Sequence, residues 1–130
     1  MRGQTNANGT DKATMVTPTI TGIMSGGARI VRDGNICLLI IDVTPQSTTT
    51  RMSITLPQGY RSAYTGYFMM GNYIGSGYAI GYMTGTEAYC TGFPNTNGTF
   101  ARIPYITNDA PVGGGRKLSL LRRLFRRRRS

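Results

Sequence analysis

One short stretch of the chain constrains the fold more than any other part of the sequence. Residues 28–32 and 36–43 are two runs of strand-forming residues, and Asp33-Gly34 lies between them. This dipeptide between two such runs indicates a tight hairpin, because type I′ turns need a positive φ at both central residues. The second run is apolar on both alternating faces except at Asp42, which predicts a strand covered on both sides. The stretch therefore indicates β structure.

The next strand signal alternates in polarity. From Arg51 to Leu56, polar and apolar residues take turns, which is typical of a strand with one face in solvent. Pro57 ends this strand because proline cannot donate to a sheet, and Gly59 allows the turn that follows. Further strand signals lie at residues 15–23, 64–70, 78–83, 87–91 and 100–107, and turn signals at 25–27, 71–72, 75–77 and 93–98.

These signals together predict an all-β fold. About seven or eight short strands with closely spaced turns are typical of an antiparallel β-sandwich, here with a jelly-roll-like arrangement. A chain of 130 residues supports one domain of this kind. We expect a flexible N-terminal segment at 1–14, the sandwich at 15–108, a glycine-rich linker at 109–115 and a basic, helix-compatible tail at 116–130.

The composition excludes most catalytic chemistry. The chain has no histidine, so no Ser–His or Cys–His pair and no imidazole metal site can be built. Two cysteines alone cannot supply the four ligands of a usual zinc site. Asp42 and Glu87 could form a carboxylate pair only if their strands were neighbours, whereas strand carboxylates usually face solvent. We therefore expect a protein that is not an enzyme, without metal or cofactor.

The two cysteines, Cys37 and Cys90, both lie inside apolar or aromatic runs. Free cysteine is among the most buried residue types, so we expect two small core residues. A disulfide between them is the alternative.

The segment from Tyr60 to Tyr82 is rich in tyrosine interleaved with glycine, serine and asparagine. Such a mixture is typical of adaptable recognition surfaces. The alternative is that the tyrosines fill the core, which has no tryptophan, or pack between subunits. Because binding residues concentrate on loops, the candidate contact residues are those of the turn and of the late loop: Asn72, Tyr73, Ser76, Tyr78, Asn95 and Asn97.

The net charge of +10 is concentrated at one end of the chain. Residues 1–115 hold seven cations against five acids and are nearly neutral. The remaining eight cations, with no acid among them, are Arg116, Lys117, Arg122, Arg123, Arg126, Arg127, Arg128 and Arg129. The basic character therefore belongs to the C-terminal tail.

The tail follows three glycines, at 113–115, that predict a flexible hinge. Leu118, Leu121 and Phe125 are spaced so that a helix would carry an apolar stripe opposite an arginine face. So short a helix is marginal alone and adjacent arginines repel, so we expect it to order only on a partner. An anionic membrane, nucleic acid or an acidic groove on a protein would fit, although phosphate binding needs no leucines. The alternative is a solvated or appended tail with no role in the fold.

Two runs of the sequence also carry a resemblance. They are Ala28-Arg29-Ile30-Val31-Arg32-Asp33-Gly34-Asn35-Ile36 and Ile54-Thr55-Leu56-Pro57-Gln58-Gly59-Tyr60-Arg61. Together they resemble the C-terminal β-sandwich domains of bacteriophage tail-fibre, baseplate and receptor-binding proteins, over roughly residues 15–107. The motifs are structural rather than catalytic. The sequence departs from the pattern at Ser62, where proline often follows the arginine, in the missing fibre-like or coiled-coil shaft, and in the basic tail.

The resemblance implies a homotrimer in a phage virion assembled in the host cytoplasm. Such a tip or head domain would attach to a host-surface saccharide or protein by non-catalytic binding. The alternative is a virion decoration or assembly protein without a receptor, whose basic tail binds nucleic acid, membrane or an acidic partner protein.

Deleting residues 116–130 should abolish binding to duplex DNA and to anionic vesicles while leaving the fold unchanged. On duplex DNA, each phosphate contact should add about −0.9 to the slope of the logarithm of the binding constant against the logarithm of the salt concentration. Binding should show no preference for DNA sequence. Vesicles should induce helix and retain the chain at higher salt than DNA does, because apolar burial is not screened. Binding assays across a salt series, with circular dichroism, test this. Equal binding by the truncated chain, or its failure to fold, would contradict the assignment.

Overall fold

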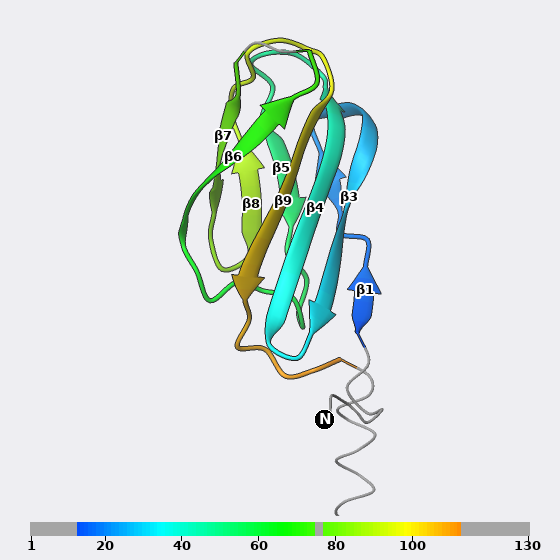
Figure 1. Ribbon diagram of the computed structural model, residues 1–130, viewed down its shortest axis with the longest axis vertical. Helices are drawn as coiled ribbons and strands as arrows, with labels where there is room; N and C mark the ends of the chain where they lie inside the picture. Colours follow the sequence, from blue (N-terminus) through cyan, green and yellow to red (C-terminus); the bar gives the residue numbers. More distant parts are fainter. Residues whose placement is uncertain (1–12, 75–76, 113–130) are drawn as a thin grey trace, which may run out of the picture.

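The computed structural model describes residues 13–74 and 77–112. These residues form nine strands and contain no helix, and thus none long and apolar enough to cross a membrane (Figure 1). The strands are β1 (Thr14–Val16), β2 (Ile20–Thr21), β3 (Ile23–Asp33), β4 (Ile36–Pro45), β5 (Met52–Thr55), β6 (Gly66–Asn72), β7 (Ala79–Met83), β8 (Glu87–Cys90) and β9 (Thr99–Ile106).

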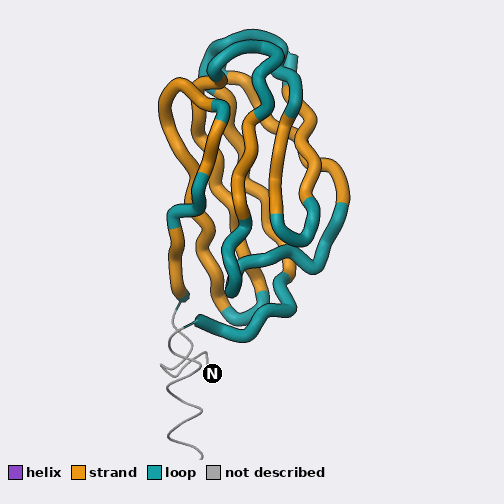
Figure 2. Tube along the Cα trace, turned by 180° about the vertical axis from the view of Figure 1, so that it is seen from behind, coloured by secondary structure: helices purple, strands orange, loops and turns teal. Residues whose placement is uncertain are grey.

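All nine strands belong to one antiparallel sheet with the order β1-β3-β4-β9-β6-β7-β8-β5-β2. The sheet curls into a half-barrel, so that its two halves face each other (Figures 1 and 2). Strand β6 joins the halves, because residues 66–70 pair with β7 whereas Gly71 and Asn72 pair with β9. The prediction of an all-β antiparallel fold is confirmed, and the arrangement observed is a single curled sheet.

The N-terminal strand signal is split in two by a buried proline. β1 pairs with β3 and β2 pairs with β5, which lie at opposite ends of the strand order. Pro18 lies between them, where it needs no sheet hydrogen bond, and the Thr55 amide donates to the carbonyl oxygen of Thr19 at 2.9 Å. The chain thus crosses from one edge of the curled sheet to the other instead of forming one strand over 15–23.

Two turn predictions in the first hairpin are wrong in position. The turn predicted at 25–27 lies inside β3, where Gly26 and Gly27 pair with Val43 and Asp42. Gly26 has φ +91°, and a Cβ there would lie 2.2 Å from the carbonyl oxygen of Asp42, so the strand requires glycine. The hairpin loop itself is Gly34–Asn35, one residue later than predicted, because Asp33 pairs with Ile36.

The core lies between the two halves of the sheet. Every second residue of β4, from Cys37 to Val43, is buried in it, with inward-facing residues of the other long strands. The opposite face of β4 is not covered by a second layer of the described chain, since Ile36 and Asp42 are exposed and Leu38 and Ile40 are half-buried. The prediction of a strand covered on both sides is therefore wrong. Apolar residues on both faces did not reveal that only one face packs within the chain.

Other sequence patterns are confirmed. In β5 the apolar members of the alternation, Met52 and Ile54, are buried and the polar ones lie outward. Cys37 and Cys90 are both buried and free, as expected of core residues, and burial raises the pKa of each thiol. Of the tyrosines, only Tyr60 and Tyr105 are buried among those the structure describes.

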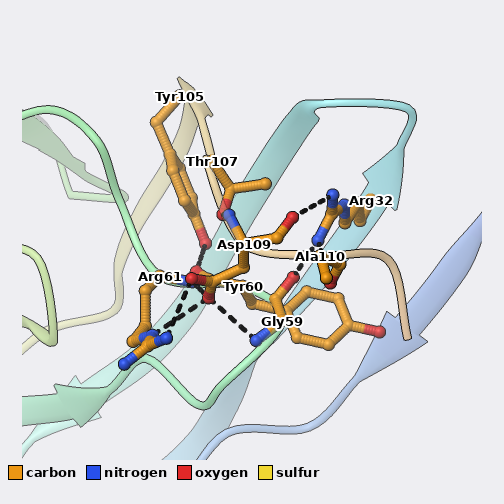
Figure 3. A network of polar contacts seen from close by, with 8 residues as sticks. All are labelled: Arg32, Gly59, Tyr60, Arg61, Tyr105, Thr107, Asp109 and Ala110. Carbon is orange, nitrogen blue, oxygen red and sulfur yellow. Dashed lines mark hydrogen bonds and ion pairs between the residues drawn. The ribbon is translucent and has the colours of Figure 1, made fainter.

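A buried arginine closes one end of the half-barrel. Arg32 is 3% exposed, and its guanidinium donates to four main-chain carbonyl oxygens, of which Figure 3 shows those of Gly59, Asp109 and Ala110. Two of these belong to turns, Gly34 at 2.8 Å and Gly59 at 2.6 Å. The other two belong to the segment after β9, Asp109 at 2.8 Å and Ala110 at 3.2 Å. One side chain thus ties together three segments that are far apart in the sequence.

Asp109 stabilises the same end of the half-barrel, which we call the Arg32 corner. Its carboxylate accepts hydrogen bonds from the Gly59 amide at 2.8 Å and the Arg61 amide at 3.1 Å, and it forms an ion pair with the Arg61 guanidinium at 3.0 Å (Figure 3). These bonds, the Arg61 side chain first among them, lower the pKa of Asp109 to about 2. The buried Tyr105 hydroxyl adds a bond to the Tyr60 carbonyl oxygen at 2.7 Å.

The described chain begins and ends beside this corner. The Tyr60 hydroxyl donates to the Thr14 hydroxyl at 2.9 Å. Val112 packs against Gly59, and a Cβ added at Gly59 would lie 2.1 Å from a methyl group of Val112. Thr14 lies in the predicted N-terminal segment, and residues 109–112 lie in the predicted linker. The predicted basic tail, with its eight cations, lies outside the described residues.

Replacing Arg32 with lysine should lower the free energy of unfolding by roughly 2 to 4 kcal/mol, because one ammonium cannot satisfy four carbonyl oxygens on three segments. Chemical denaturation measures this. Arg29→Lys is the matched control, because Arg29 lies on the same strand but is exposed, and it should change stability little. Equal effects of the two substitutions would contradict the role of Arg32.

Asp109→Asn should destabilise the protein by about 2 kcal/mol at pH 7, because a neutral amide weakens charge-assisted bonds. A carboxyl whose folded pKa is depressed contributes stability above its unfolded pKa of about 3.9, and this is lost as pH falls toward 2. Denaturation measured between pH 7 and 2 should therefore show that the difference in free energy of unfolding between wild type and variant becomes smaller below pH 4. The exposed turn variant Asp33→Asn should follow the wild-type profile, and a gap that stays constant would refute the assignment.

Candidate functional site

Three loops converge at the end of the sheet opposite the Arg32 corner (Figure 1). They follow β4, β6 and β8, and their described residues are 46–51, 73–74 with 77–78, and 91–98. The Phe93 amide donates to the Thr48 carbonyl oxygen at 3.0 Å, and the Tyr73 amide donates to the Gly98 carbonyl oxygen at 2.9 Å. The late loop therefore contacts both of the others, and the three form one surface.

A pair of asparagines fixes the contact between two of these loops. The Asn72 side-chain amide donates to the Asn95 side-chain oxygen at 3.0 Å, and the reciprocal bond measures 3.4 Å. Each side-chain oxygen also accepts a backbone N–H two residues later, from Ile74 at 3.2 Å and from Asn97 at 2.9 Å. Each asparagine thus holds its own turn and the neighbouring loop at once.

Tyr73 connects these loops to the outer face of β4. Its ring lies 4.8 Å from that of Phe100 and against Gly98, where a Cβ would meet the ring at 2.4 Å. Its hydroxyl donates to the Asp42 carboxylate at 3.2 Å, and this bond to an anion is the main cause of a raised Tyr73 pKa. The ring nevertheless remains 59% exposed, so it can contact another molecule.

The structure brings together four of the six predicted contact residues. Asn72, Tyr73, Asn95 and Asn97 share the two bonded loops described above. Tyr78 is exposed immediately before β7, and the adjacent Gly77 lies so close to Pro94 that a Cβ there would be 2.9 Å away. Ser76 lies outside the described residues.

The sequence analysis missed a groove beside these loops. It has a volume of about 530 Å³ and is lined by residues 25–29 of β3 together with Ile40 and residues 42–44 of β4. Gly26 and Gly27 contribute no side chains to its lining, while Arg29 and Asp42 supply one cation and one anion. The signal that could have revealed it is the glycine pair inside a strand, which we had assigned to a turn.

A row of tyrosines lies on the other outer face of the sheet. Tyr67, Tyr82 and Tyr89 are cross-strand neighbours, and the Arg51 guanidinium lies 3.9 Å from the centre of the Tyr89 ring. Arg51 also forms an ion pair with Glu87 at 2.8 Å. A hydrogen bond from Ser53, then the bond from Arg51, lowers the pKa of Glu87. The row borders a depression of about 250 Å³.

The arrangement offers binding groups rather than a reactive pair. Asp42 and Glu87 lie on β4 and β8, which three other strands separate, so the condition for a carboxylate pair is not met. Within 13–74 and 77–112, no three His, Cys, Asp or Glu side chains gather as metal ligands would. The groove and loops instead present two amides, an aromatic ring, a carboxylate and a guanidinium on one continuous surface.

Comparisons with models of protein families, with curated proteins and with solved structures give no match to this chain. The function of this chain is therefore inferred from its own residues and their arrangement.

Replacing Asn95 with alanine should loosen the two bonded loops, because it removes the acceptor of the Asn97 amide and the partner of Asn72. We expect a loss of about 1 kcal/mol in stability and faster hydrogen exchange at the Asn97 and Ile74 amides. Amide exchange followed by NMR measures both. Asn108→Ala, at an exposed position near the opposite end, should leave these amides unchanged. Unaltered exchange in the Asn95 variant would show that the amide pair does not order the loops.

Proposed function

We propose that this chain is a phage virion component, a tail-fibre tip or head domain that attaches to a host surface by non-catalytic binding. The main support for the proposal is that the two ends of the described chain and the candidate binding loops lie at opposite ends of the sheet. Thr14 and Val112, near the two ends of the described chain, lie beside one corner, while the loops with Tyr73 and the asparagines lie at the other end. A domain attached through its termini would therefore hold these loops outward, as a tip requires.

Residues of the Arg32 corner also belong to the two runs on which the sequence resemblance rests. Arg32, Gly59, Tyr60 and Arg61 belong to the two runs that resemble phage tail-fibre domains, and all four take part in one hydrogen-bonded network (Figure 3). A run of residues that closes the fold is compatible with many different receptors. We propose that the curled sheet, whose halves enclose one core, is a jelly-roll-like sandwich of that kind.

The surface chemistry favours a polar ligand. Loops rich in tyrosine and asparagine give rigid contact area together with adaptable hydrogen bonds. Beside them, Arg29 and Asp42 in the lining of the groove add charged donors and acceptors. A host-surface saccharide or an exposed protein segment fits these groups, and we propose a homotrimer as the form that presents several such surfaces together.

The second candidate is a virion decoration or assembly protein that has no receptor. The observation in its favour is the concentration of eight cations within residues 116–129. Val112, the last described residue before the tail, lies at the corner and not at the loops. Binding of nucleic acid, a membrane or an acidic protein surface would then be the main task.

Attachment can be tested with the fluorescently labelled full chain on a panel of bacterial strains and on a glycan array. The variant with Tyr73→Ala and Tyr78→Ala should bind at least about tenfold more weakly, because exposed aromatic residues often dominate binding energy. Tyr67→Ala, on the outer face of β6, is the matched control and should bind as the wild type does. Undiminished binding by the double variant would refute the loop assignment. Binding to no strain and no glycan would favour the decoration protein.

A further inference from the structure

The outer face of β1, β3, β4 and β9 carries an apolar patch at the end where the described chain begins and ends. We call it the aliphatic patch. Three of its members are more than half exposed, with Met15 and Ile36 at 60% and Ile106 at 57%. The complete patch consists of Met15, Val31, Ile36, Leu38, Pro104 and Ile106.

The strand register makes this patch continuous. Met15 pairs with Val31, Val31 pairs with Leu38, and Leu38 pairs with Pro104, so these four form one row across four strands. Ile36 pairs with Ile106 in the next outward row. Directly paired residues of antiparallel strands project from the same face, and the residues between them, such as Cys37 and Leu39, are fully buried on the other face.

The aliphatic patch differs from the tyrosine row on the other outer face. The tyrosines carry hydroxyl groups, and Arg51 covers part of Tyr89 while pairing with Glu87. That face is therefore partly polar and can remain in water. The six side chains of the aliphatic patch have no hydrogen-bonding oxygen or nitrogen, and an exposed apolar patch of several hundred Å² is often an interaction site.

The size of the patch suits an interface between proteins. Six side chains of this kind expose on the order of 400 Å² of apolar surface. A stable interface buries about 800 Å² on each partner, and somewhat more than half of that is apolar. The aliphatic patch can thus supply most of the apolar area that one side of such an interface needs.

The charges around the patch help to choose the occupant. Arg29 and Arg102 flank Ile40 in the row above it, and Asp33, cross-strand from Ile36, is the acid at its lower end. Asp42 lies two residues beyond Ile40 on the same face, so these charges balance and do not attract the tail of this chain, which holds eight cations. A second copy is different, because residues 1–115 are nearly neutral and its own aliphatic patch would be buried in the same contact.

We propose that the aliphatic patch is the interface at which copies of this chain pack against one another. The inference rests on the proposed self-association and names the face that forms it. Since β1 lies in the patch and Val112, the last described residue, lies beside the neighbouring corner, packing through this face brings the Val112 residues of the copies toward one another. The basic tails then act on one anionic partner as a multivalent group, which raises apparent affinity without any new contact.

Sedimentation velocity over a range of about 1 to 300 μM tests the interface on the full chain. Ile36→Lys should raise the dissociation constant of self-association at least tenfold, because it places a charge in the apolar contact. The same lysine lies opposite Asp33 and supports the hairpin, so the monomer should stay folded by circular dichroism. Ile106→Lys should have the same effect. Ile80→Lys, on the tyrosine face and 51% exposed, is the matched control and should change the constant less than threefold.

Three results would overturn the inference. These are a wild-type chain that remains at 14.1 kDa throughout the range, equal weakening by the Ile80 control, and no weakening by either patch variant. Attachment is measured separately, since the Ile36→Lys monomer should still bind cells or glycans through its loops, with lower avidity. If the folded monomer lost all binding, the aliphatic patch would not be separate from the receptor-binding surface. If the monomer kept single-site binding, the two surfaces would be distinct, as proposed.

Discussion

The buried guanidinium of Arg32 is the interaction on which the rest of this fold depends. Taking a cation out of water is costly unless its donors are satisfied, and here they are satisfied by main-chain oxygens rather than by a carboxylate. The partners are two turns and the segment after β9, whose carbonyl groups are not paired in the sheet. The same hydrogen bonds therefore compensate the desolvation of the guanidinium and satisfy the carbonyl groups of three irregular segments.

This arrangement divides the molecule into two ends with different physical character. At the Arg32 corner, Asp109 and Tyr105 fix the turn at 59–61 through charged or buried bonds, which leaves little freedom in sequence. At the opposite end, the loops are joined mainly by neutral amide and backbone bonds, such as those between Asn72 and Asn95. Loops held in this way can change their exposed residues while the closing corner stays the same, which is the usual division between scaffold and binding surface.

The sequence predicted what local periodicity encodes, and it missed what depends on distant partners. The alternation from Arg51 to Leu56 identified the inward face of β5 because it reports only the two sides of one strand. Arg32 gave no comparable signal, since an arginine in a strand looks like a solvent-facing residue until Gly59 and Asp109 are placed beside it. Gly26 illustrates the same limit, because its close approach to Asp42 arises only after β3 and β4 pair.

The candidate site shows a similar division between loop positions and loop contacts. The turn predicted at 71–72 is wrong, because Gly71 and Asn72 lie at the end of β6, whereas the loop that carries Asn95 agrees with its turn residues. The bonds between Asn72 and Asn95 could not be foreseen, because they depend on β6 and β9 being neighbours through only two residue pairs. The groove was missed for a related reason, since part of its lining belongs to glycines in a strand whose length the sequence alone did not reveal.

The exposed aromatic residues follow from how little room the core provides. Inside the curled sheet, Phe68 lies against Gly81, where a Cβ would be 2.2 Å from its ring, and small residues such as Ala79 and Ala88 face the same space. Methionine and phenylalanine fill what remains, so a further ring could enter only by displacing them. Tyr67 and Tyr73 are thus outside because the interior is already full. Their exposure leaves broad amphipathic surfaces at the loops and on the β6 face, where a second molecule, rather than the chain's own core, can complete their packing.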